Sequence, residues 1–491
     1  MYAQCEACIK SEGTLSPLFS CETGVKQGDV MSPNLFNVYI NDLPDIFNGD
    51  TDSPALDTHA VHCLLYADDL VLLSLSLNGL QDKLNKLHIY CKQWELTINV
   101  KKSKVMILSP NTTSFPSEVL KIGDLPLEWV SNYKYLGIEI HSNGNMVAAS
   151  ENLCTRGWKA TFKLKSTLKD MDVQPATRLK LFDTLIKPII CYGSDVWGPL
   201  INLQNSKSVD IFWRKSEKLP VETFQLKYCK NVLGVHSKAT NAAVMGELGR
   251  LPVTLFLIKT SLRFCQHIEE VGDRMPLLMA AVAEDKILNG NKSWRRSLEN
   301  ILNLFNFSLN GNAINDNFIT KVMEKMKAKY IEYWRNSLGD TNNNNGKLYI
   351  YRKIKSNYQL EPYLNHVTKS KHRRSMTALR ISTHKLEIET GRHATKNNQK
   401  IKRDERLCTL CRKNNVNCVG DEEHALLVCP TFEKQRREVV NFIGDQYPSF
   451  HKLDNRGKMI YMLTCENMFA QKVSKYIHGI LSMQRPRIGT V

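Results

Sequence analysis

The pattern of apolar and polar positions predicts helices and short strands in the first 145 residues. A short helix is predicted over 35–40, because Ser32 and Pro33 form a suitable helix start. Strands are predicted over 96–100, 105–108 and 135–140. One further set of apolar residues recurs at steps of four and three and therefore occupies one face of a second helix: Leu80, Leu84, Leu87, Cys91 and Trp94.

Two apolar runs, at 62–65 and 70–73, flank the sequence Tyr66-Ala67-Asp68-Asp69. This pattern predicts a buried hairpin with two carboxylates at its tip. Desolvated like charges repel each other, so the pattern indicates a compensating cation. Mg²⁺ prefers carboxylate oxygens, and a pair of such ions stabilises the attacking and the leaving oxygen of phosphoryl transfer. The alternative is an Asp-Asp turn that faces solvent, with neither charge buried.

From residue 146 to about 340 the apolar period is helical. Pro175 opens one helix, and a second stripe runs from Phe318 to Trp334 at steps of four. Such stripes form protein cores far more often than cofactor sites. The polar segment 339–346 predicts a loop or a domain boundary. The stripe that follows Pro175 consists of Leu179, Phe182, Leu185, Ile186, Ile189 and Ile190.

Composition adds a clue to the partners. The chain has 491 residues, 42% of them apolar, which excludes a wholly disordered or collagen-like protein and predicts two to four domains. Its net charge of +17 is divided unevenly, with a balance of −8 over residues 1–100 and +25 over the remainder. This division favours cations held by the first part and a polyanion held by the second, although a solvated basic surface would look the same.

The 14 cysteines are scattered, and no signal segment opens the chain. We therefore expect an intracellular protein of the nucleus or cytoplasm. A membrane span is not expected, because the most apolar run, 61–77, is broken by Asp68 and Asp69.

Four motifs occur in order along the first part of the chain. They are GVKQGDVMSPNLFN at 24–37, YADD at 66–69, NVKKSK at 99–104 and YLGI at 135–138. Together they resemble the palm of reverse transcriptases of non-LTR (LINE-type) retrotransposons.

The resemblance implies an α+β fold, with a partial right-hand polymerase palm of antiparallel sheet and helices followed by an all-helical thumb and C-terminal region. The reaction implied is addition of dNTPs to a DNA primer on an RNA template by two-metal phosphoryl transfer. The expected domains are a partial palm at 1–145, a helical thumb and connector at 146–338, a basic helical region at 347–400, a zinc-binding module at 401–435 and a helical tail at 436–491.

The resemblance also implies roles for individual residues. Asp68 and Asp69 would be the catalytic Mg²⁺ ligands, and Tyr66 would pack near the primer end. Gln27, flanked by glycines such as Gly28, would contact the template base or the incoming dNTP. Asn99 would lie at the nucleotide as well.

Lys102 of the same element would neutralise the triphosphate or protonate the leaving pyrophosphate. Lys101 or Lys104 are alternatives for this role. Tyr135 and Gly137 would belong to the strand that grips the primer.

Three departures from the family pattern matter. The family's third essential carboxylate lies on a strand upstream of the first motif, and only 23 residues precede Gly24 here. Asp29 and Val30 stand where the family more often has small or neutral residues and proline, and an upstream nuclease domain is missing. We therefore expect a truncated reverse transcriptase whose own polymerase activity is weak or absent.

The basic remainder offers two candidate surfaces for nucleic acid. Residues 369–406 hold 12 Lys and Arg against 4 acids, among them Lys371, Arg373, Arg374 and Arg380. This density favours contact with an RNA or DNA backbone, although a localisation signal would look similar. The other candidate is a phosphate-facing helix side in the expected thumb, with a solvated helix face as the alternative: Arg156, Lys159, Lys163, Lys165 and Lys169.

Cys408, Cys411, His424 and Cys429 follow a C-x2-C-x12-H-x4-C pattern. Three thiolates and one imidazole suit a tetrahedral Zn²⁺ with no open position, and hence a structural site. Related elements often carry such a motif after the polymerase region. Cys418 is a bystander or a competing ligand, and a chance cluster of reduced thiols is the alternative.

Two other functions stay open. The first is an RNA-templated RNA polymerase, against which the third and fourth motifs and the Cys/His pattern argue. The other is a non-catalytic RNA- or DNA-binding protein derived from a retroelement fragment. The oligomeric state cannot be inferred from these patterns.

Overall fold

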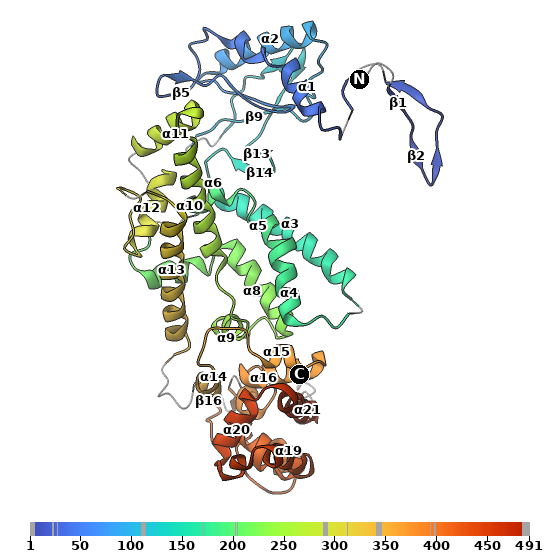
Figure 1. Cartoon of the computed structure of the whole chain (residues 1–491), viewed down its shortest axis with the longest axis vertical. Helices are drawn as coiled ribbons and strands as arrows, with labels where there is room; N and C mark the ends of the chain where they lie inside the picture. Colours follow the sequence, from blue (N-terminus) through green and yellow to red (C-terminus); the bar gives the residue numbers. More distant parts are fainter. Residues whose placement is uncertain are drawn as a thin grey trace. The chain divides into compact units, whose positions relative to one another are not determined.

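The computed structural model describes residues 5–483 apart from 22–23, 27, 110–113, 170, 202, 204, 288–292, 312, 340–345, 393 and 397–398. The chain divides into two compact units (Figure 1). Unit 1 comprises Met1–Tyr135, Ile140–Asn145 and Val271–Leu288, and unit 2 comprises Leu136–Glu139, Met146–Glu270 and Asn289–Val491.

Unit 1 mixes helices with short strands. Its helices are α1 (Ser32–Tyr39), α2 (Leu77–Gln93) and α11 (Pro276–Ile287), which returns from the middle of the chain to pack beside β5. The strands are β1 (Cys5–Ala7), β2 (Lys10–Ser11), β3 (Thr14–Leu15), β4 (Phe19–Cys21), β5 (Ala55–Leu56), β6 (His59–Ala60), β7 (Cys63–Tyr66), β8 (Asp69–Leu72), β9 (Lys104–Val105), β10 (Lys121–Ile122), β11 (Leu125–Pro126), β12 (Glu128–Trp129) and β13 (Asn132–Tyr135); β14 (Ile138–His141) straddles the boundary between the units.

Helix α2 organises the core of unit 1. Ser76 caps it by accepting a hydrogen bond from the Gly79 amide at 3.1 Å. Its apolar face buries Leu84 and Leu87 against two clusters, one of which includes Leu70 and Leu72 of β8. The second cluster also holds Val105 of β9, which pairs in parallel with β12. The hairpin β7–β8 is therefore anchored through one face of β8.

Unit 2 is almost entirely helical. One hydrophobic core runs through it from Leu153 in α3 to Ile480 in α21. Its elements are α3 (Met146–Thr167), α4 (Pro175–Leu181), α5 (Lys187–Ile190), α6 (Ser194–Trp197), α7 (Val209–Ser216), α8 (Pro220–Leu233), α9 (Asn241–Glu247), α10 (Val253–Val271), α12 (Trp294–Asn303), α13 (Asp316–Ser337), α14 (Tyr349–Ile354), α15 (Tyr363–His366), α16 (Ser370–Arg380), α17 (Glu387–Thr390), β15 (Thr395–Lys396), β16 (Gln399–Lys400), α18 (Thr409–Arg412), α19 (Glu433–Gln446), α20 (Asn455–Thr464) and α21 (Asn467–Met483).

The helix predictions are confirmed, with one change of register. Helices α1, α2, α4 and α13 lie where the periodicity placed them. After α4 the chain makes a π-helical turn at Phe182–Ile186, which adds a residue to the turn. The buried stripe therefore runs through Leu179, Phe182, Ile186 and Ile190, while Leu185 is half exposed.

The strand predictions are confirmed only in part. Residues 96–100 form no strand, because their backbone groups bond locally, with the Leu96 amide donating to the Cys91 carbonyl at 2.8 Å. Of 105–108 only the first residue lies in a strand. The predicted strand 135–140 is interrupted by a turn at Leu136 and Gly137, whose φ angles are 46° and 85°. The predicted loop at 339–346 falls mostly outside the described residues.

The mixed composition of helices and strands confirms the expected α+β fold at the level of its class. The narrower domain names given to segments of unit 2 stay predictions. Among the residues that the structure describes, no helix combines the length and the apolar character that a bilayer crossing requires.

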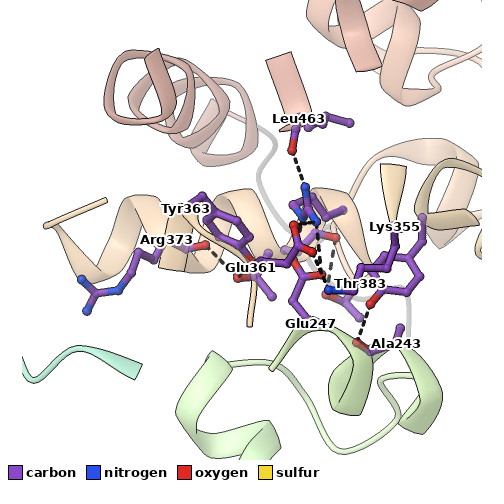
Figure 2. Close-up of polar contacts among 12 residues, drawn as sticks. Ala243, Glu247, Lys355, Glu361, Tyr363, Arg373, Thr383 and Leu463 are labelled. Atoms are coloured by element: carbon purple, nitrogen blue, oxygen red, sulfur yellow. Dashed lines mark hydrogen bonds and ion pairs between the residues drawn. The ribbon is translucent and has the colours of Figure 1, made fainter. Parts of the chain in front are cut away.

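A buried ion cluster joins five segments of unit 2 (Figure 2). Arg380 of α16 is fully buried, and its Nε donates to Glu247 at the end of α9 at 2.6 Å. The same guanidinium also donates to Glu361, which precedes α15, and to the Leu463 carbonyl of α20. Lys355, just after α14, pairs with Glu361, so that two cations face two carboxylates.

The hydrogen-bond partners of this cluster complete its charge balance. The Tyr363 hydroxyl donates to Glu247 at 2.8 Å, and the Arg380 guanidinium lies 5.0 Å from the centre of the Tyr363 ring. Burial alone would lower the pKa of Arg380, but Glu247 and Glu361 raise it above its ordinary value. Arg380 therefore stays charged, and the cluster fixes α16 against α9 and α20.

Removing the guanidinium should destabilise unit 2. We expect Arg380→Met to cost about 3–5 kcal/mol, because Glu247 would be left buried and uncompensated. The measurement is the denaturation midpoint followed by tryptophan fluorescence, since Trp197, Trp213 and Trp334 are all buried in unit 2. Arg437→Met, at the exposed pair with Glu433, is the control and should leave the midpoint nearly unchanged. Equal midpoints for the two variants would contradict this account of the cluster.

Candidate functional site

The sequence Tyr66-Ala67-Asp68-Asp69 forms a tight hairpin in unit 1. Strands β7 and β8 are antiparallel, and Tyr66 pairs directly with Asp69. Only Ala67 and Asp68 lie between them, and Ala67 has a φ of 51°. A two-residue hairpin loop requires such a left-handed residue, and a side chain there carries strain that is typical of functional sites. The turn presents both carboxylates at its tip.

The expectation that this hairpin is buried is wrong. Asp68 and Asp69 are exposed, and so are Leu64 and Tyr66, at 41% and 64%. The reason is topological: among the described residues β7 and β8 form a sheet of only two strands, so one face of the hairpin stays open. Solvent therefore reaches both carboxylates, and burial does not require a cation beside them. Their capacity to bind a cation depends on the two groups being adjacent at the tip.

Asn99 and Lys102 form a compact turn. The Asn99 side-chain oxygen accepts a hydrogen bond from the Lys102 amide at 3.2 Å, and its carbonyl accepts from Ser103. This leaves the Lys102 side chain exposed. Lys101 is exposed as well, whereas Lys104 pairs with Glu128 at 2.6 Å. Of the three lysines, Lys104 is thus the one engaged within the fold.

Strand β13 links this turn to the hairpin. The Tyr133 hydroxyl donates to the Lys102 carbonyl at 3.2 Å. Two residues later, burial raises the pKa of Tyr135, and the nearby Asp69 carboxylate raises it further. Strand β13 therefore contacts the third motif through Tyr133 and lies near the second motif through Tyr135, the first residue of the fourth.

The first motif is described only in part. Gln27 lies outside the described residues. Gly28 has a φ of 88° with open space around its Cα, and Asp29 accepts a hydrogen bond from the Met31 amide at 3.0 Å. Ser32 fixes the start of α1 by donating to the Lys26 carbonyl at 2.6 Å. Phe36 of α1 packs in the same hydrophobic cluster as Leu70 of β8, which connects this segment to the hairpin.

Gly137 lies in unit 2, where side chains from α3 and from the segment after α5 hold its turn. Arg156 of α3 donates to the Gly137 carbonyl at 3.0 Å, and the Tyr192 hydroxyl donates to the Leu136 carbonyl at 3.0 Å. A Cβ at Gly137 would lie 3.1 Å from the Tyr192 ring. Arg156, one of the residues predicted to face phosphate, therefore has a structural partner.

Two arginines of the basic segment 369–406 also have structural partners. Arg380 is buried in the ion cluster described above. Arg373 is 6% exposed and binds Asp172 at 2.7 Å and the Val367 carbonyl. The expectation that these two side chains contact a nucleic-acid backbone is wrong for Arg380, because none of its surface is exposed. Lys371 and Arg374 remain exposed.

Cys408, Cys411, His424 and Cys429 converge in unit 2 as predicted. All four are buried, and their ligand atoms lie within 4.8 Å of one another. The Cys411 Sγ is 3.6 Å from the Cys429 Sγ and 3.3 Å from the His424 Nε2. Zinc bonds of about 2.0–2.3 Å in a tetrahedron give edges of roughly 3.3–3.8 Å, so this donor set fits Zn²⁺.

Burial shifts the pKa values of the ligands in this cluster. Burial lowers the pKa of His424, which keeps the imidazole neutral. Burial also raises the pKa of the Cys411 thiol to about 12, with further contributions from the neighbouring Cys429 and Cys408. Cys418 is outside the cluster, and its carbonyl accepts a hydrogen bond from the Cys408 amide at 2.8 Å.

Sequence reasoning missed three residues that hold the site. Tyr192 and Tyr133 gave no sequence signal beyond their residue type. Lys83 did give a sequence signal, because it is a charged residue on the apolar face of α2, one residue before Leu84. It is 1% exposed and its ammonium donates to the Leu73 carbonyl and to Ser53, which ties the end of the hairpin to α2.

Residues 2–140 match the family model described as reverse transcriptase (RNA-dependent DNA polymerase). The chain is 26% identical over 204 residues to the RNA-directed DNA polymerase from mobile element jockey of Drosophila melanogaster, covering 39% of this chain and 21% of that protein. It is 30% identical over 139 residues to an uncharacterized transposon-derived protein of Caenorhabditis elegans, covering 27% and 48%.

A third relative, from Drosophila melanogaster, is named for an RNA-directed DNA polymerase from transposon BS. The identity is 27% over 186 residues, or 36% of this chain and 20% of the relative. The chain thus spans half or less of each of these three relatives.

The turn at Gly137 can be tested by substitution. We expect Gly137→Ala to lower the stability of unit 2 by about 1–3 kcal/mol more than Gly311→Ala, because the added methyl meets the Tyr192 ring. Gly311 is a suitable control, since its φ of 75° is similar and nothing lies within 4 Å of the position that a Cβ would take there. Thermal denaturation of both variants measures the difference. An equal loss would show that backbone strain alone, rather than contact with Tyr192, restricts this position.

Proposed function

Because this chain carries a reverse transcriptase domain of the non-LTR retrotransposon type, we propose that it acts in copying RNA into DNA. In this proposal the exposed tip Asp68-Asp69 binds Mg²⁺, and the basic remainder of the chain holds an RNA template and a DNA primer. The single observation that carries the proposal is the YADD hairpin, because its tight turn holds two adjacent carboxylates at an exposed tip, with Asp69 near Tyr135.

Asp68 and Asp69 fit a magnesium ion through the chemistry of their donors. Both are hard oxygen ligands, and their exposure leaves room for the waters and phosphate oxygens that Mg²⁺ retains. When bound, the ion would neutralise charge on the transferred phosphoryl group.

The surrounding residues have roles that follow from their placement. Lys102, on the turn held by Asn99, is free to neutralise the triphosphate of a dNTP. Tyr66 pairs with Asp69 in the hairpin and Tyr135 lies near Asp69, so both are suited to the primer end; Gly137 precedes the next strand. Gln27 and Gly28 complete the proposed nucleotide contacts.

We further propose that this chain has weak or no polymerase activity by itself. The supporting observation is that, within the described part of the chain, no third Asp, Glu, His or Cys ligand gathers with Asp68 and Asp69. Two carboxylates hold one ion loosely, whereas the two-metal reaction needs a fuller donor set. The same observation favours a second candidate function, a nucleic-acid-binding protein without catalysis.

We propose that Cys408, Cys411, His424 and Cys429 bind a structural Zn²⁺. Because the three thiols belong to the core of unit 2, the ion would stabilise α18 and the turn at His424 against α19–α21. Four protein ligands leave no open position, so the ion would have no part in catalysis.

Primer extension tests the polymerase proposal. With Mg²⁺, dNTPs and a DNA primer on an RNA template, we expect at most trace extension by the purified chain. Any trace should disappear in Asp68→Ala, because the remaining carboxylate cannot hold the ion. Asp82→Ala, which removes an exposed carboxylate of α2, is the control and should leave the trace unchanged.

Robust extension would contradict the claim of weak activity. A trace that survives Asp68→Ala would contradict the assignment of the hairpin.

Metal analysis tests the zinc proposal. We expect one zinc per chain, its loss in the double variant Cys408→Ser, Cys411→Ser, and its retention in Cys418→Ser. Loss of the metal should also lower the denaturation midpoint of unit 2, since metal binding and folding are coupled. A chain purified without zinc, or one that loses zinc only in Cys418→Ser, would refute the ligand set.

Zinc affinity should rise with pH. Binding must displace the thiol protons that burial holds in place, so the metal-bound state carries fewer protons than the metal-free state. Competition with a chromophoric chelator between about pH 6 and pH 8 measures this slope. An affinity independent of pH would mean that the thiols are not the ligands.

A further inference from the structure

A cavity of about 400 Å³ opens within unit 2 among α3, α4, α8 and α16. Its lining brings together six cationic side chains and a single carboxylate, Asp172. The cations are Lys165 of α3, Lys169 just after it, Arg178 of α4, Lys227 of α8, and Arg373 and Arg374 of α16.

The single carboxylate is already engaged. Asp172 binds Arg373 at 2.7 Å with one oxygen and accepts a hydrogen bond from the Ser370 amide at 3.1 Å with the other. Over the part of the chain that the structure describes, Lys165, Lys169, Lys227 and Arg374 have no ion-pair partner. The cavity therefore holds an excess of positive charge that the fold itself does not compensate.

The fold holds the guanidinium groups close together. Arg178 donates to the Asn231 side chain at 2.6 Å, and the Tyr228 hydroxyl donates to the Arg178 carbonyl at 2.8 Å. Arg374 lies over Gly234, where a Cβ would come within 2.5 Å of its Nε. Burial, and then the charges of Arg374 and Arg373, lower the pKa of Arg178. An anion between these groups would relieve the repulsion.

Aromatic rings line the same cavity. Phe162 of α3 lines it and is 65% exposed. Its ring is 6.2 Å from that of Trp158, which packs in turn at 4.2 Å on the buried Phe224. A supported, exposed ring is a stacking surface for a base.

We propose that this cavity binds single-stranded nucleic acid, with a phosphate among Lys165, Lys169, Arg178 and Arg374 and an unpaired base on Phe162. Its volume suits one nucleotide, whereas a duplex keeps its bases stacked inside the helix and offers none to the ring. All the lining residues belong to unit 2, so the proposal does not depend on the polymerase chemistry proposed for Asp68 and Asp69.

The test is fluorescence anisotropy with a labelled 12-nucleotide single-stranded RNA of mixed sequence. The protein is the full chain carrying Asp68→Ala and Asp69→Ala, in buffer without Mg²⁺, which removes any contribution from the hairpin. The double variant Lys165→Gln, Lys169→Gln should weaken binding at least tenfold and lower the slope of log K against log salt by about 1.4, given about 0.7 per phosphate contact on a single strand.

The matched control is Lys321→Gln, Lys325→Gln, which removes two exposed lysines at the same spacing from α13, outside the cavity. It should weaken binding by less than about twofold. Phe162→Ala should weaken binding between about fivefold and a hundredfold, whereas Leu185→Ala, at another exposed apolar side chain of unit 2, should not. Thermal denaturation confirms that each variant is folded.

Three results would overturn the proposal. The first is an equal loss in the two double-lysine variants, which would mean that binding follows net charge alone. The second is a Phe162→Ala variant that binds normally. The third is competition by a 12-base-pair duplex, or by free nucleoside triphosphate, as strong as that by the single strand.

Discussion

The buried guanidinium of Arg380 is the interaction on which the arrangement of unit 2 depends. It is fully buried and binds the end of α9, the segment before α15 and the last turn of α20. An arginine is tolerated in that position because Glu247 and Glu361 neutralise its charge and each of its three side-chain nitrogens donates a hydrogen bond. The ion cluster around Arg380 connects the N-terminal helices of unit 2 with its C-terminal helices, which carry the Cys/His cluster. Both sets of helices share one hydrophobic core.

Clusters of like charge without such a partner indicate where a ligand of opposite charge could bind. Two buried cations of unit 2 are paired with carboxylates, Arg380 with Glu247 and Lys355 with Glu361. At the hairpin tip two aspartates stand side by side, and in the cavity of unit 2 six cations face one carboxylate. A bound cation at the tip and a bound anion in the cavity would supply charge of opposite sign, as the proposed magnesium ion and phosphate backbone do.

Sequence patterns predicted the helices well because their apolar stripes are set by the chain itself. They also predicted the Cys/His cluster, since four ligands at suitable spacing need only a short loop to meet. The burial of the hairpin could not be predicted, because it depends on whether further strands pair with β7 and β8. The exposure of individual basic residues could not be predicted either. Arg380 and Arg374 are six residues apart on α16, yet Arg380 is buried and Arg374 lines a cavity. The packing of α16 against α21 and α8, together with the salt bridge from Arg380 to Glu247 of α9, distinguishes the two positions.

The central claim is that unit 2 holds the single-stranded part of a nucleic acid while the hairpin tip faces the primer end. Photocrosslinking measures this directly, with a DNA primer on an RNA template whose single-stranded overhang carries 5-iodouridine. The account predicts that the crosslinked peptides, identified by mass spectrometry, contain Phe162 or Trp158 of α3. Crosslinks spread evenly over the basic surface, or confined to unit 1, would contradict it.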